Sequence, residues 1–441
     1  MLTPKKNTIN SIKSAILSSD IATRMVRGTF WSFTGTAIAK AIVLISGIIC
    51  AHILGKDQYG ELGMIRSTIS MFTIIGFSGL GLTATKYIAE FKHSHKERIF
   101  SIYSLTNTFA CILGVVITSL VIYFAPLIAT ISLNSPYLVD EIRLGGLLLF
   151  ITILDGAQQG TLSGFEDFKS IAINTLIGSL FESALMLTGA YYYGVGGAVF
   201  GFGFGYIALY IANIVSIRKN FKILGYSNVK SFAIEHRDLH LLYKFSLPAA
   251  LSALVIPFAF WLIKALLVRN DGYGALAIFD AADQWKIIIL FIPTAVSQIV
   301  LPILSGIANV DTTKFWKVLW LNIILNGCIA LVIAIIISLF SGQIMRLYGN
   351  SFDYTTPLIL LAASTVFTSV SHVIGMSISS RAKMWIGFSF NIIWALILIL
   401  CSYLFINKGL GATGIALSVC ISYIVHTIIQ FCYVKIITKS N

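Results

Sequence analysis

Eight charged side chains stand out because they lie inside long apolar stretches of the sequence. The bases are Lys40, Arg66, Lys264 and Lys286, and the acids are Asp155, Glu182, Asp280 and Asp283. A charge in the middle of a membrane costs about 2.5 kcal/mol or more, so it must face a polar cavity or an opposite charge. Lys and Arg in such a cavity bind phosphate or carboxylate groups, and a desolvated carboxylate gains affinity for a proton.

Polar neighbours accompany several of these charges at helical spacing. Asp155 shares its stretch with Gln158, Gln159 and Ser163, and a late stretch carries Ser418, Ser422, His426 and Gln430, each four residues after the last. Such stripes place polar atoms on one face of a helix and predict a polar central cavity. The alternative is internal ion pairing, such as Asp283 with Lys286, which only fixes helix packing.

The elements that position these residues are predicted to be transmembrane helices. Of the 441 residues, 57% are hydrophobic and 11% are charged, and the mean hydropathy is +0.87. Soluble domains carry about 25% charged residues, so a water-soluble fold is excluded. The sequence predicts an all-α polytopic membrane protein with twelve spans, at 27–53, 62–90, 99–125, 143–165, 171–193, 197–217, 241–268, 275–306, 316–341, 354–380, 385–406 and 411–434.

The distribution of loop charges predicts the orientation in the membrane. Twenty Lys and Arg residues fall on the side of the termini and five on the other side, so both termini should be cytoplasmic. This bias accounts for the net charge of +13 without a nucleic-acid partner. No cofactor or metal is expected, because the pairs His93 with His95 and His236 with His240 lie in basic loops without acidic or cysteine partners.

An internal repeat divides the chain into two halves. Tyr59 and Tyr273, Gly197 and Gly411, and Lys169 and Lys383 are each separated by 214 residues. Because each half holds six spans, the halves are parallel repeats around a central cleft, an arrangement found in transporters. The expected organisation is a cytoplasmic amphipathic segment 1–26, an N-lobe 27–217, a basic linker 218–240, a C-lobe 241–434 and a tail 435–441.

Two motifs resemble a known family. Residues 53–60 read ILGKDQYG and residues 77–91 read FSGLGLTATKYIAEF. They resemble the polysaccharide transporter family of the multidrug/oligosaccharidyl-lipid/polysaccharide (MOP) exporter superfamily, and the O-antigen flippases in particular. The resemblance implies two six-helix lobes around a cationic cavity. It also implies alternating-access transfer of polyprenyl-diphosphate-linked oligosaccharide from the inner to the outer leaflet of the bacterial cytoplasmic membrane, without enzymatic chemistry. Further expected partners are membrane lipids, a glycan polymerase and a chain-length regulator.

The residue roles follow from position within the spans. We expect Lys40, Arg66, Lys264 and Lys286 to contact the headgroup, and Asp155, Glu182, Asp280 and Asp283 to bind a coupling proton or Na+. The alternatives are a multidrug/cation antiporter of the same superfamily, which would favour an acidic, aromatic cavity, and a membrane glycan polymerase or ligase, which would need a large outer loop. A passive assembly factor would leave single cavity charges dispensable.

Overall fold

The described part of the chain is helical. The computed structural model describes residues 20–92, 96–225, 246–307, 312–381 and 383–439, and these contain no β-strand. The main helices are α2 (Asp20–Ile74), α3 (Leu82–Phe91), α4 (Lys96–Leu127), α5 (Val139–Gly164), α6 (Phe168–Ile223), α7 (Leu247–Ile307), α8 (Thr312–Leu339), α10 (Thr356–Ser379), α11 (Met384–Asn407) and α12 (Gly411–Lys439). The short helices are η1 (Ile75–Gly81), η2 (Ile128–Ser132), η3 (Pro136–Leu138), α9 (Ser341–Arg346) and η6 (Asn350–Phe352).

Three of the long helices are broken by a glycine, so each forms two membrane-spanning arms. Gly55 in α2 has φ 75° and ψ 177°, and Gly272 in α7 has φ 80° and ψ 177°. Gly194 breaks α6 with φ 60°. Positive φ is strained for residues with a Cβ, which explains why glycine occupies these corners. The corner at Gly272 lies three residues beyond the position that the 214-residue repeat pairs with Gly55, so the two halves bend at nearly equivalent places.

The predicted number of twelve spans is confirmed. The described residues contain eight helical stretches that are long and apolar enough to cross a membrane. Three of these are the broken helices, with two arms each, which makes eleven spans. The twelfth is α5, whose hydropathy is lowered by Asp155, Gln158 and Gln159.

The predicted span 62–90 is helical throughout but changes its helix type in the middle. Residues Ile75–Gly81 form a π-helical segment between α2 and α3. Methyl groups at Gly76 and Gly81 would lie 2.5 Å from the carbonyl oxygens of Ile153 and Gly156 on α5. These glycines let the backbones of η1 and α5 approach closely, and the wider turn of a π-helix is typical of functional regions.

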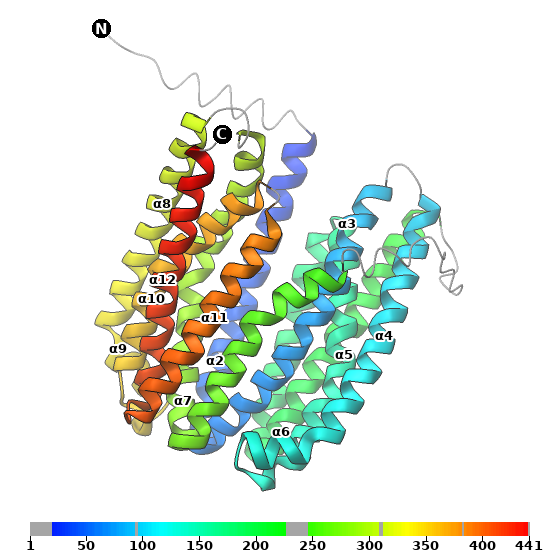
Figure 1. The fold of residues 1–441 in the computed structure, drawn as a ribbon. Helices are drawn as coiled ribbons and strands as arrows, with labels where there is room; N and C mark the ends of the chain where they lie inside the picture. The colour runs from blue at the N-terminus through cyan, green and yellow to red at the C-terminus, as the bar shows by residue number, and fades with distance from the viewer. Residues whose placement is uncertain (1–19, 93–95, 226–245, 308–311, 382, 440–441) are drawn as a thin grey trace.

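The helices form two lobes. Figure 1 shows α3, α4, α5 and α6 on one side, α8 and α10–α12 on the other, and α2 and α7 between them. The α2 helix packs against both α6 and α7. In Figure 1, α2 begins and α12 ends at the same end of the molecule, which we call the terminal end; the opposite end is called the far end. The ribbons of the lobes diverge toward the terminal end.

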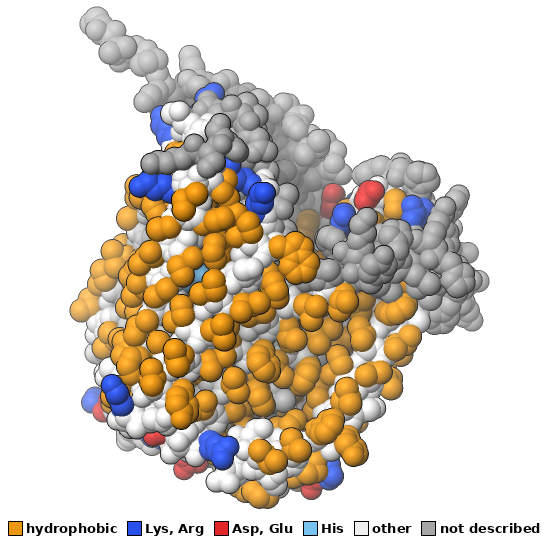
Figure 2. Space-filling model, in the orientation of Figure 1, with side chains coloured by type: hydrophobic (Ala, Val, Ile, Leu, Met, Phe, Trp, Pro, Cys, Tyr) orange, Lys and Arg blue, Asp and Glu red, His pale blue; other side chains and the backbone are white. Residues whose placement is uncertain are grey.

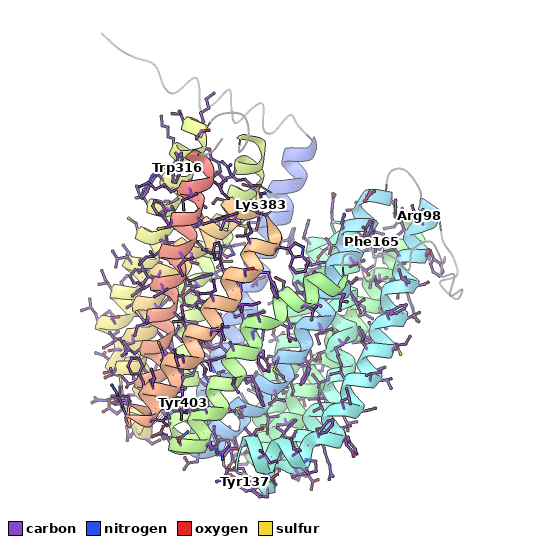
Figure 3. All side chains as sticks on the ribbon, in the orientation of Figure 1. Arg98, Tyr137, Phe165, Trp316, Lys383 and Tyr403 are labelled. Carbon is purple, nitrogen blue, oxygen red and sulfur yellow. The ribbon has the colours of Figure 1, made fainter. Side chains whose placement is uncertain are left out.

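The loops lie on the two ends as the predicted topology requires. Arg98 and Lys383 lie at the terminal end and Tyr137 at the far end (Figure 3). Hydrophobic side chains cover the face between the ends, and the basic and acidic side chains on this face gather at its two ends (Figure 2). Such a surface suits a protein surrounded by lipid.

Several predicted features fall outside the described residues. They are most of the amphipathic segment 1–26, most of the linker 218–240, and the pairs His93 with His95 and His236 with His240. The exact domain boundaries remain predictions.

Candidate functional site

A cavity of about 630 Å³ lies between the lobes, where α2, α6 and α7 meet. Six of the eight predicted charged residues line it, namely Lys40, Arg66, Glu182, Lys264, Asp280 and Asp283. Hydroxyl and amide groups line it as well, from Thr36, Ser67, Ser70, Thr175, Ser179 and Gln284, and so do the aromatic rings of Tyr59, Phe202, Tyr206 and Phe260. The cavity therefore combines charge, hydrogen-bonding groups and flat apolar surface.

The N-lobe side of the cavity contains an ion pair between α2 and α6. Arg66 Nη2 donates to Glu182 Oε1 at 2.6 Å, and the two side chains are 20% and 16% exposed. The guanidinium also lies 4.6 Å from the centre of the Phe202 ring. Gly205 makes room for this arrangement, because a methyl group there would overlap the Cβ of Glu182.

The C-lobe side contains a second ion pair, between the two arms of α7. Lys264 Nζ lies 2.9 Å from Asp280 Oδ1. Asp280 also reaches the other lobe, since a methyl group at Gly63 on α2 would overlap its carboxylate. This carboxylate thus contacts both lobes.

Lys40 differs from the other cavity cations. It lies on the first arm of α2 and lines the cavity beside Thr36. Within the described residues it has neither an acidic partner nor a hydrogen-bond acceptor. An ammonium group without a counter-charge is available to an anion that enters the cavity.

Lys286 supports the cavity from beside it. It forms an ion pair at 2.5 Å with Asp283, three residues earlier on α7, and its ammonium lies 4.6 Å from the centre of the Phe260 ring. Asp283 lines the cavity, whereas Lys286 does not. The alternative of an internal ion pair between Asp283 and Lys286, given above for the sequence, is therefore present in the structure.

The predicted position of Asp155 in the central cavity is wrong. Asp155 is 3% exposed and lies inside the N-lobe, where its Oδ1 is 3.5 Å from the Asn213 amide. Asn213 in turn accepts from Asn174 Nδ2 at 2.9 Å. Asp155 therefore contacts α6 and none of the polar stripe of α5 lines the cavity, while the glycines of η1 and α5 hold these two helices in close contact.

The polar stripe of α12 also lies elsewhere than expected. His426 Nδ1 is 2.9 Å from the Ser371 hydroxyl on α10, and the same hydroxyl donates to Gln430 Oε1 at 3.0 Å. These residues form a network inside the C-lobe and do not line the central cavity.

A seam at the far end closes the cavity on that side. Gln284 Nε2 donates to the Tyr59 hydroxyl at 2.6 Å, and the Tyr348 hydroxyl donates to Gln284 Oε1 at 3.3 Å. Nearby, His52 Nε2 lies 2.8 Å from the carbonyl oxygen of Leu347. Tyr59 and Tyr348 are almost fully buried, so these contacts join the α2 corner to the C-lobe.

In the sequence, Tyr59 is a landmark of the repeat only, and no pattern singles out Tyr348. The motif DQYG around Tyr59 was the available signal.

Just outside the seam, the Tyr137 hydroxyl donates to Glu61 Oε1 at 2.6 Å. Burial, and then this hydrogen bond, raise the pKa of the Tyr137 hydroxyl.

The arrangement of charges suits reversible binding of an anion. Arg66 and Lys264 are held by carboxylates at hydrogen-bonding distance, and Lys40 has no ion-pair partner within the described residues. An incoming phosphate offers the same charge-assisted hydrogen bonds that the carboxylates now provide. The hydroxyl groups nearby suit a polyhydroxylated ligand.

Comparison with known proteins agrees with this architecture. Two relatives from Ralstonia are each called EPS I polysaccharide export inner membrane protein EpsE. One, from Ralstonia nicotianae, is 22% identical over 88% of this chain and 89% of its own length; the other, from Ralstonia solanacearum, is 28% identical over 42% of this chain and 43% of its own length. A putative O-antigen transporter of Shigella dysenteriae is 23% identical over 72% of this chain and 78% of its own length.

The fold is also that of solved transporters. An inward-facing multidrug resistance MATE family transporter of the MOP superfamily superposes with a TM-score of 0.80, at 17% identity, over 91% of this chain and 95% of that chain. The family model described as polysaccharide biosynthesis protein matches residues 25–308, which include both arms of α2, α6 and α7 and hence the whole cavity. The chain therefore belongs to the polysaccharide biosynthesis protein family and has the two-lobe fold of the MOP superfamily.

Proposed function

We propose that this chain is a flippase for polyprenyl-diphosphate-linked oligosaccharide, an O-antigen or a related glycan repeat unit. It would move this lipid from the inner to the outer leaflet of the bacterial cytoplasmic membrane by alternating access. The observation that carries the proposal is a cavity between two lobes in which Lys40, without an ion-pair partner among the described residues, lies beside two exchangeable ion pairs. The names of the relatives, which refer to polysaccharide export, O-antigen transport and the inner membrane, support it.

The charges and hydroxyl groups of the headgroup match the side chains that line the cavity. Lys40, Arg66 and Lys264 contact the diphosphate, while Lys286 keeps Asp283 neutralised at the edge of the site. The hydroxyls of Ser70 and its neighbours bind the first sugars. The cavity volume of about 630 Å³ lies within the range of about 300–1,000 Å³ that is typical of small-ligand sites, so the lipid tail and the distal sugars stay outside.

The orientation follows from the loop charges, which favour a cytoplasmic terminal end. With that orientation the far-end seam around Tyr59 and Gln284 closes the outer side, and the headgroup enters the cavity between the lobes from the cytoplasmic side. Without such a cavity, the polar headgroup would have to cross hydrocarbon at a prohibitive cost.

The acids provide ion coupling in this proposal. Glu182, Asp280 and Asp283 are each bound to a cation, so they act at the substrate site itself. Asp155 is separate: it is buried, its Oδ2 has no hydrogen-bond partner, and it forms no ion pair within the described residues. A buried carboxylate without a cationic side chain beside it takes up a proton or a cation such as Na+.

A multidrug/cation antiporter is the second candidate. The observation that favours it is the acidic and aromatic part of the lining, with Glu182, Asp280 and Asp283 beside Phe202 and Phe260. Each of these acids is already neutralised by a cation, which leaves Lys40 as the charge without a partner among the lining residues that the structure describes. The lining therefore favours an anionic substrate over a cationic drug.

Reconstitution in liposomes tests the proposal. Purified protein is inserted with fluorescent lipid-linked oligosaccharide in both leaflets, and a membrane-impermeant quencher reports the fraction that changes leaflet, with and without proton or Na+ gradients. We expect faster leaflet exchange than in protein-free liposomes. Leaflet exchange no faster than in protein-free liposomes under every gradient would refute the flippase. Extrusion of a cationic dye in the same liposomes would favour the antiporter.

A further inference from the structure

The described cavity is close to electrical balance before any substrate arrives. Its lining contains three cations, Lys40, Arg66 and Lys264, and three carboxylates, Glu182, Asp280 and Asp283. Lys286, bound to Asp283, adds one more cation. Four positive and three negative groups leave one net positive charge when all are ionised.

A diphosphate diester brings more negative charge than this surplus can neutralise. Each of its two phosphates carries one negative charge at neutral pH, so the loaded cavity would hold one net negative charge. An uncompensated charge in a partly desolvated site is unfavourable. One additional positive charge is required for neutrality.

Arg66 and Glu182 are the pair that the headgroup would separate. Arg66 and the free Lys40 lie on the two arms of α2 and line the same cavity, so a diphosphate that binds both takes Arg66 away from Glu182. Glu182 has no other ion-pair partner within the described residues. By contrast, Asp283 remains paired with Lys286 when the headgroup binds. Lys286 does not line the cavity, so the headgroup does not compete for it.

We infer that headgroup binding breaks the Arg66–Glu182 pair and that the released Glu182 carboxylate takes up a proton from the medium, so that headgroup and proton occupy the cavity together. This inference rests on the proposed function. No covalent bond of the substrate changes: the proton adds to a carboxylate oxygen of Glu182, and the phosphate oxygens replace that carboxylate at Arg66. Proton and substrate therefore assist each other's binding instead of competing.

Other titratable and charged groups surround the pair, and they define its electrostatic environment. They are Lys40, Cys50 and Tyr59 from α2, Tyr206 from the second arm of α6, Asp155 from α5, and Lys264, Asp280 and Asp283 from α7.

Joint binding of headgroup and proton determines the net charge that crosses the membrane, and hence how the membrane potential acts on transport. Two negative charges and one proton leave one net negative charge that moves outward with each headgroup. A membrane potential that is negative inside favours this movement.

Calorimetry on the purified full-length protein in nanodiscs tests the inference. The probe is a short-chain prenyl diphosphate N-acetylglucosamine, titrated with chelator present in buffers of different ionisation enthalpy, which yields the number of protons taken up per ligand. We expect about one proton per ligand near neutral pH and, by linkage, an affinity that falls about tenfold per pH unit where uptake is complete.

Three variants locate the proton. In Glu182→Gln the neutral amide replaces a protonated carboxyl, so binding should persist with no proton uptake and little pH dependence. Asp140→Asn is the control, since Asp140 is an exposed carboxylate paired with Arg143 away from the cavity; its uptake should equal that of the wild type. Uptake that survives in Glu182→Gln but vanishes in Asp280→Asn would overturn the assignment to Glu182.

The wild-type measurement decides the inference even if a variant does not fold. Binding of the ligand without proton uptake, or binding that requires Mg²⁺ in place of a proton, would overturn it while leaving the flippase intact. No binding together with no leaflet exchange in liposomes would instead refute the proposed function, and the inference with it.

Discussion

Replacement of Arg66 by Gln separates a role in transport from a role in folding. The substitution leaves Glu182 without its partner at 2.6 Å. Breaking a fully buried pair costs about 3–5 kcal/mol. Because these side chains keep 20% and 16% of their surface exposed to the cavity, we expect a smaller loss of stability, about 1–3 kcal/mol.

The same substitution should also weaken transport. A hydrogen bond to a charged group contributes about 1.5–3 kcal/mol, so loss of the Arg66–phosphate contact should lower the transport efficiency about 10- to 150-fold. The assays are thermal unfolding in detergent, leaflet exchange in liposomes and surface glycan in a strain that lacks this protein.

The double variant Arg66→Gln/Glu182→Gln discriminates between the two roles. It removes both charges and lets the two amides form a hydrogen bond, so thermal stability should return to near that of the wild type. Transport should remain low, because the phosphate contact is still missing. Full recovery of both stability and leaflet exchange would refute the reasoning and make Arg66 a purely structural residue.

Three further substitutions have distinct expected outcomes. Lys40→Gln should leave thermal stability unchanged, because Lys40 has no partner within the described residues, and should raise the substrate KM about tenfold or more; an unchanged KM in the liposome assay contradicts this. Gly63→Ala should displace the Asp280 carboxylate and increase labelling by an impermeant thiol reagent of a cysteine introduced at the far end; unaltered labelling would show that the contact does not hold the seam. Tyr59→Phe removes the hydroxyl that Gln284 contacts at 2.6 Å, which should destabilise the closed seam by about 1 kcal/mol. Spin labels across the seam should then report a larger far-end distance in a greater share of molecules, and a distance distribution identical to that of the wild type would show that this hydrogen bond does not hold the seam closed.

The span pattern was predictable because it depends on local composition, whereas the sidedness stays a prediction from the loop charges. Runs of apolar residues predict membrane helices, and Tyr59 with Tyr273 marks equivalent corners in two parallel repeats. The corners themselves are continuous helices with one positive-φ glycine, at Gly55 and Gly272, which hydropathy alone does not distinguish from loops.

Six of the eight expected charged residues line the cavity, but the ion pairs between separate helical arms were not predictable. Arg66 and Glu182 are 116 residues apart, and their contact depends on the relative rotation of α2 and α6, which the sequence does not encode locally. Asp155 illustrates the same limit. Its helical spacing shows which polar residues share a face, but not whether that face meets the central cleft or, as in the structure, the interior of the N-lobe.

The lipid's diphosphate provides the most direct test of the central claim, that cations between the lobes hold an anionic headgroup during its crossing. Leaflet exchange is measured in the same liposomes for two lipids with one glycan and one tail, joined either by a diphosphate or by an uncharged ether linkage. The account predicts that the diphosphate lipid crosses rapidly and that the ether lipid crosses no faster than in protein-free liposomes. Equal protein-dependent rates for both lipids would contradict it.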